Sequence, residues 1–135
     1  MTYLRLGILL FLLISCKSTM SQPKEVVINL ASVLDEDICT ISINDVEYFK
    51  DVKIITDRSL GIDLQNHIIL KNPDTQLHFK MSFVGKIVPD IPEIDNKRIM
   101  EIDTVLKLED TRFMILTARM EEIEFLRSKK KIPLD

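Results

Sequence analysis

The chain has 135 residues, of which 18 are basic and 21 are acidic, so its formal net charge at pH 7 is −3. This acidic balance argues against a nucleic-acid-binding protein, which needs a basic face to neutralise phosphates. The length suits one domain with a substantial core and leaves little room for two. We therefore expect a single domain and no nucleic-acid partner.

The first sixteen residues contain the parts of a secretory signal in the usual order. Arg5 precedes an apolar run over residues 6–14, and Ser15-Cys16 follows that run. The run is shorter than the roughly 20 residues that a helix needs to cross the hydrocarbon core of a bilayer. We therefore predict that residues 1–15 are a cleaved signal peptide and not a permanent span.

The end of this segment, Leu13-Ile14-Ser15-Cys16, resembles the lipobox of bacterial lipoproteins. The resemblance implies that Cys16 is acylated, becomes the mature N-terminus and holds the protein to membrane lipid. Two or three acyl chains anchor a protein lastingly, because each buried methylene contributes about 0.8 kcal/mol. The alternatives are an ordinary secretory signal that has Cys16 near its cut, and an uncleaved anchor.

The residue after this cysteine bears on the location that the lipoprotein resemblance implies. Many Gram-negative lipoproteins that stay in the inner membrane have aspartate there, whereas this chain has Lys17. The resemblance therefore implies a bacterial cell-envelope protein, lipid-anchored in the outer membrane. Whether it faces the periplasm or the cell surface stays open.

Residues 16–24 read as the lipidated N-terminus and a tether, and residues 25–135 as one β-rich domain. The tether is polar, contains Pro23 and shows no periodicity. A flexible coil of this length spans about 15 Å, so the domain should lie close to the membrane. Loss of the signal peptide leaves 17 basic and 21 acidic residues, a net charge of −4.

From Glu25 onward, apolar residues recur mostly at every second position, which sends alternate side chains to opposite faces of a strand. Asn44-Asp45 predicts a tight hairpin and Asn72-Pro73-Asp74 a further reversal. A loop is expected over residues 88–97, because proline gives no donor to a sheet. The predicted strands are residues 26–34, 38–43, 46–49, 52–56, 60–64, 67–71, 76–84 and 98–108.

Cys39 alternates with Ile41 and Ile43 on one face of a predicted strand. We therefore interpret Cys39 as a small buried apolar group. With Cys16 carrying lipid, no second cysteine is left for a disulfide inside the domain. A reactive thiol or a bridge between molecules is the alternative for Cys39.

Residues 111–130 fit two structures, because Phe113, Leu116 and Met120 fall at helical spacing while residues 122–125 alternate as in a strand. We favour two strands with a bend at Glu121-Glu122. The chain then predicts an all-β fold, an antiparallel β-sandwich or small barrel of about eight or nine short strands. The alternative is an α+β fold with one C-terminal helix.

The sequence offers little for catalysis. His67 and His78 are its only histidines, and neither stands in the setting of a nucleophilic hydrolase, so we expect both on the solvated surface. The chain lacks Gly-x-Ser-x-Gly, a Gly-rich phosphate loop and His-Glu-x-x-His. We predict a protein that is not an enzyme, with no catalytic residue, no metal site and no cofactor.

Two acidic clusters and one basic run complete the candidate sites. Asp35-Glu36-Asp37 and the acidic residues of segment 90–95 offer oxygen ligands, but they lack the spacing and the glycine of a calcium loop, so we expect solvated turns. The basic residues of segment 127–131 suit either anionic headgroups or plain solvent.

Three classes of function remain. We favour a non-catalytic binding or accessory module, held at the membrane, that contacts another envelope component through an exposed strand edge or loop. A small-ligand carrier or inhibitor is the alternative, and it needs an apolar pocket lined by residues such as Phe79, Met81 and Phe83. An envelope hydrolase is least favoured and would need a pair of carboxylates acting on a glycan.

Overall fold

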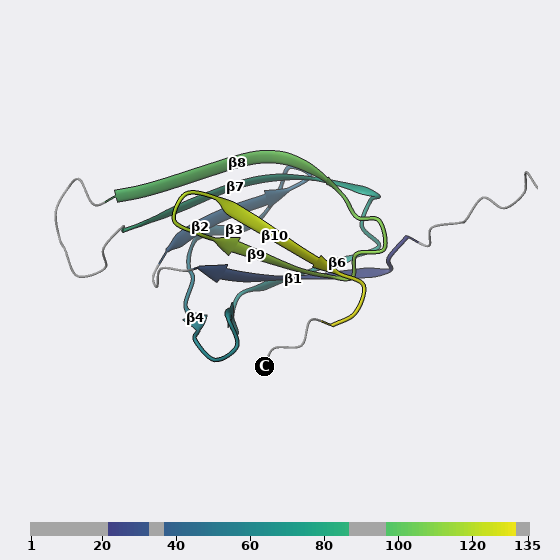
Figure 1. Ribbon diagram of the computed structural model, residues 1–135. Coiled ribbons are helices and arrows are strands. Elements are labelled where there is room, and N and C mark those ends of the chain that lie inside the picture. The colour runs from purple at the N-terminus through teal and green to yellow at the C-terminus, as the bar shows by residue number, and fades with distance from the viewer. Residues whose placement is uncertain (1–21, 33–36, 87–96, 132–135) are drawn as a thin grey trace, which may run out of the picture.

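The computed structural model describes residues 22–32, 37–86 and 97–131, and within these ranges the chain forms ten strands and no helix. The strands make two four-stranded sheets and one short hairpin. The sheets stack as the two layers of a β-sandwich (Figure 1). The predicted all-β class is confirmed, and the alternative of a C-terminal helix is wrong for the described residues.

We call the two layers the β1 sheet and the β7 sheet. Neighbouring strands run antiparallel, except that β1 and β9 are parallel. The β1 sheet has the order β10 (Ile123–Ser128), β9 (Phe113–Ala118), β1 (Glu25–Ser32) and β6 (His67–Lys71). The β7 sheet has the order β3 (Val46–Lys53), β2 (Ile38–Ile43), β7 (Gln76–Lys86) and β8 (Lys97–Lys107). The hairpin pairs β4 (Thr56–Asp57) with β5 (Ile62–Asp63).

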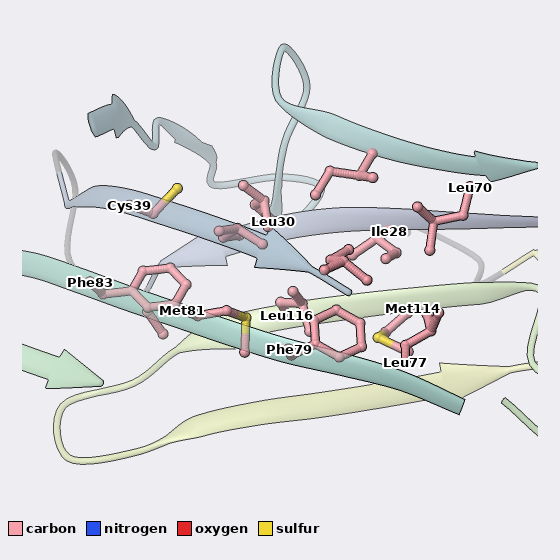
Figure 2. Close-up of a cluster of buried hydrophobic side chains, with 14 of the residues drawn as sticks. Ile28, Leu30, Cys39, Leu70, Leu77, Phe79, Met81, Phe83, Met114 and Leu116 are labelled. Carbon is pink, nitrogen blue, oxygen red and sulfur yellow. The ribbon is translucent and has the colours of Figure 1, made fainter. Parts of the chain in front are cut away.

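Alternation along the strands fills the space between the layers. In β7, the side chains of Leu77, Phe79, Met81 and Phe83 are buried, while Lys80 between them is exposed. Figure 2 shows such side chains from both sheets meeting between the layers. The apolar positions that the period of two predicted therefore form the core.

The thiol of Cys39 belongs to this core and has no exposed surface. Burial, with a smaller contribution from the nearby carboxylates of Asp63 and Asp37, raises the pKa of Cys39 to about 12. The prediction of a buried apolar cysteine is confirmed.

Tight backbone turns occur where the sequence predicted them. Asn44 and Asp45 both have positive φ, 51° and 61°, which suits the two-residue hairpin between β2 and β3. The reversal at Asn72, φ 46°, carries the chain from β6 in one sheet to β7 in the other.

The segment after the first hairpin differs from its prediction. Two strands over residues 46–49 and 52–56 were expected, but β3 runs through from Val46 to Lys53. Asp51 has a positive φ of 52°, and the pairing of β2 with β3 shifts register nearby. A bulge interrupts the alternation without ending the strand, which explains why the pattern looked broken.

Residues 111–130 form two strands, as we favoured. In the turn that joins β9 to β10, the amide of Arg119 donates to the carbonyl of Glu122 at 2.8 Å. The rings of Phe125 in β10 and Phe79 in β7 meet in a T-shaped arrangement at a centroid distance of 5.9 Å. This contact packs β10 onto the opposite layer.

Some predicted features lie outside the described residues. They are the signal peptide and Cys16, the acidic residues Asp35 and Glu36, and residues 87–96, which hold most of the expected proline loop. Among the residues that are described, no helix is both long enough and apolar enough to cross a membrane.

Candidate functional site

The outer face of the β1 sheet carries an apolar strip. Because the neighbouring positions of β1 and β9 point into the core, Val27, Phe113 and Ile115 point outward. Val27 pairs with Phe113 on one side and with Ile69 of β6 on the other. An apolar row therefore crosses the sheet on the side that faces away from the core.

The β4–β5 hairpin covers one end of this strip, where Ile62 and Leu60 pack against Ala31 and Ile115. Beside the hairpin a hollow of about 230 Å³ remains open. It is lined by Val27, Asn29, Ile62, Asp63, Leu64, Phe113, Ile115 and Lys131.

A larger hollow of about 630 Å³ continues from the first, since both are lined by Val27, Phe113 and Lys131. We call this larger hollow the basic groove. Its lining holds five cationic side chains and a single carboxylate, that of Glu25. The complete lining is Gln22, Lys24, Glu25, Val27, Arg112, Phe113, Lys129, Lys130 and Lys131.

The strand order of the β1 sheet explains why these cations meet. β1 and β9 are parallel, so Lys24 before β1 and Arg112 before β9 lie at the same end of the sheet. β10 runs back antiparallel to β9, so Lys129 after β10 arrives at that end too. The amide of Arg112 donates to the carbonyl of Ser128 at 2.9 Å, and the carbonyl of Arg112 accepts from Val27 at 2.9 Å.

Most of the groove's charge is not neutralised within the described residues. Lys129 forms an ion pair with Asp110, with 2.5 Å between Nζ and Oδ2. In the same ranges, no ion pair involves Lys24, Arg112, Lys130 or Lys131. The groove therefore presents cations to solvent.

The basic residues of segment 127–131, which the sequence places in one run, lie in two different surroundings in the fold. The three lysines line the groove, whereas the guanidinium of Arg127 donates to the carbonyl of Lys107 in the other sheet at 2.9 Å. Sequence reasoning missed Lys24 and Arg112, because only the parallel pairing of β1 with β9 brings them to the lysines. No local pattern signals that pairing.

The two histidines are not brought together. His67 is exposed in β6, while His78 lies on the outer face of the β7 sheet, where its Nε2 contacts Oδ1 of Asp103. Among the described residues, no group of three or more histidine, cysteine, aspartate or glutamate side chains is placed to hold a metal ion.

One predicted surface residue is buried instead. Asp37 was expected in a solvated turn, but its side chain is fully buried and forms an ion pair with Arg98 of β8, which is also buried. The hydroxyl of Ser32 donates to the Asp37 carboxylate, and the guanidinium of Arg98 donates to the carbonyl of Arg119. An arginine at an inward position of β8 needs an anion, and Asp37 is that anion.

This buried cluster is closely packed. A Cβ added to Gly85 would lie 1.7 Å from Oδ1 of Asp37, so a side chain there would displace the Asp37 carboxylate. Among the described residues, Oδ1 of Asp37 and Nε of Arg98 have no hydrogen-bond partner. The cluster ties the ends of β1 and β8 to the β9–β10 turn.

Comparison with protein-family models, with curated proteins and with solved structures found no match to this chain.

Proposed function

We propose that the chain is a lipid-anchored protein of the bacterial cell envelope, most simply in the outer membrane. Its β-sandwich is a non-catalytic binding or accessory module that contacts another envelope component. The anchor is an acylated Cys16, for which the support is the likeness of Leu13-Ile14-Ser15-Cys16 to a lipobox.

The observation that carries the proposal of a binding module is a filled core beside a long unpaired strand edge. Phe79 and Phe83 have no exposed surface, so the side chains that a ligand carrier would place around a pocket fill the interior instead. β8 has 11 residues and is the last strand of its sheet, paired with β7 on one side and with no other strand of the described ranges.

The chemistry of β8 suits the addition of a partner strand. Ile99 and Val105 are each 56% exposed on its outer face, and Glu101 and Asp103 lie between them. A partner strand would gain main-chain hydrogen bonds along the edge, and the alternating side chains would give specificity. At the C-terminal end of β8, the guanidinium of Arg127 donates to the carbonyl of Lys107, so this carbonyl is already occupied and a partner strand would pair with the rest of the edge.

Site-specific photocrosslinking in intact cells tests this function. A photoreactive residue at Ile99 and another at Val105 should capture the same envelope protein. A third at Leu126, which is 55% exposed on the other sheet, should not capture it. Val105→Lys should weaken capture from position 99, because it places a charge on the edge.

A Cys16→Ala arm of the same experiment tests the anchor. The variant should incorporate no radiolabelled fatty acid and should leave the membrane fraction, and capture at β8 should fall with it. Unchanged labelling would refute acylation of Cys16. Equal capture from all three probe positions would refute β8 as the contact edge.

A further inference from the structure

We propose that the basic groove binds the anionic headgroups of a phospholipid bilayer and so holds the outer face of the β1 sheet against the membrane. This inference deepens the proposed function, and it relies on that function only for the step that brings the chain to a bilayer. The groove combines positive charge, adjacent exposed apolar surface and the entry of the chain at Gln22.

Charge complementarity favours an anionic occupant. The groove gathers Lys24, Arg112 and three consecutive lysines, Lys129 to Lys131, around one carboxylate, in a chain whose net charge is −3. Basic residues near an anionic bilayer surface attract it additively, and the effect fades within a Debye length. Four of these five cations form no ion pair within the described residues and are therefore available to anionic headgroups.

Exposed aliphatic side chains on the same side favour a membrane surface. Ile69, 46% exposed, pairs with Val27 of the groove, and Leu126, 55% exposed, pairs with Ile115 beside it. Leu64 on the hairpin side is 56% exposed. A surface that combines lysines with aliphatic groups suits the headgroup boundary, where the apolar parts enter and the charged ends reach phosphate.

The place where the chain enters the sandwich agrees with this orientation. Gln22 lines the groove, and its side-chain amide donates to the carbonyl of Pro73. Cys16, the proposed site of acylation, is six residues earlier in the sequence. Six extended residues span at most about 20 Å, so a lipid at Cys16 would keep the groove near the bilayer surface.

The same orientation leaves the proposed partner edge free. In Figure 1, β8 lies on the side of the sandwich opposite the β4–β5 hairpin, and Ile62 and Leu64 at this hairpin line the smaller hollow that continues into the groove. A bilayer along the β1 sheet would therefore not cover β8.

Lysine footprinting of the full chain in lipid nanodiscs tests the groove. One set of discs contains phosphatidylcholine alone, and the other contains an added fraction of phosphatidylglycerol. Acetylation of Lys24, Lys130 and Lys131 should be roughly fivefold slower in the anionic discs, the change expected for a lysine held near an anionic surface. Lys50 and Lys86 of the β7 sheet should react equally in both, and added salt should abolish the difference.

Two matched charge variants separate the groove from general electrostatics. Lys130→Glu with Lys131→Glu should abolish the protection of Lys24, whereas Lys50→Glu with Lys86→Glu changes the net charge equally and should preserve it. Loss of protection in both variants, or equal acetylation in both kinds of disc, would overturn the proposal. Protection in native envelopes but not in anionic discs would also overturn it, in favour of an acidic protein.

The result distinguishes this inference from the anchorage. A chain that stays in neutral discs and gains no protection in anionic discs contradicts the groove alone. A chain that leaves neutral discs but binds anionic ones supports the groove and contradicts the anchor.

Discussion

Arg98 and Asp37 form a buried ion pair at one end of the sandwich. Two charges in an apolar interior stabilise a fold only when they are well paired, because each loses its hydration. The pair is held in place by Ser32 and by the Arg119 carbonyl, while Gly85 leaves space for the carboxylate. Each of these residues therefore affects stability through the ion pair.

Gly85→Ala should lower the free energy of unfolding by about 2 kcal/mol or more, because the new methyl group occupies the position of the Asp37 carboxylate. Urea denaturation of both proteins measures the difference. Gly61→Ala is the matched control, since a Cβ there meets no atom within 4 Å and adds only the strain of a φ of +68°. A smaller loss for Gly85→Ala than for the control would contradict the packing argument.

Cys39 gives a prediction that depends on pH. Burial raises its pKa to about 12 from the usual 9.0, so the thiol stays neutral in the fold at pH values where it ionises in the unfolded chain. The unfolded state then binds fewer protons, and stability should fall as pH rises from about 9 toward 12.

Cys39→Ala isolates this effect, because alanine does not ionise. The difference in stability between the two proteins, measured by urea denaturation at a series of pH values, should be constant below pH 9 and should shift in favour of the alanine variant above it. The thiol should also resist a water-soluble disulfide reagent until the protein unfolds. A pH-independent difference would show that Cys39 ionises freely in the fold.

At the scale of elements, β10 depends on a contact with the other layer. Phe125 meets Phe79 edge to face, and the Arg127 guanidinium holds the Lys107 carbonyl. Both contacts cross between the sheets along the side where β10 and β8 are the outermost strands. They set the position of β10 and hence of Lys129, which follows it.

Phe125→Ala should therefore lower stability by about 2 kcal/mol, less than for a fully buried ring, and should speed amide exchange over residues 123–128. Leu126→Ala is the control on the same strand, because Leu126 is 55% exposed and points away from the core. Hydrogen exchange with mass spectrometry and urea denaturation measure both effects. Similar losses in the two variants would mean that Phe125 does not hold β10 to the other layer.

Sequence periodicity was most informative at this scale. The bounds of β2 and β6 agree with their predictions because both strands alternate without interruption. β3 was divided in two because the bulge at Asp51 breaks the alternation, although the strand continues. A bulge adds a residue to one strand only, and its partner is not visible from local spacing.

At the scale of the whole molecule, the two sheets present different outer faces. The β1 sheet carries the basic groove with its aliphatic border, and the β7 sheet ends at the long edge of β8. The proposals assign membrane contact to the first and partner contact to the second. Under both proposals, the domain would act as a spacer that orients a binding edge relative to the bilayer.

The sequence by itself determined the all-β class, most strand positions, the buried Cys39 and the hairpin at Asn44-Asp45. These features depend on residue type and on a period of two, which are local. It also contained the lysines of residues 129–131, but not the surface to which they belong.

Only the tertiary structure decided that Lys24 and Arg112 join those lysines, and that Asp37 lies buried against Arg98. Both outcomes depend on pairing between strands far apart in the chain. The parallel pairing of β1 with β9 and the packing of one sheet on the other are set by the total burial of apolar surface. That quantity belongs to the folded molecule, and no short stretch of sequence contains it.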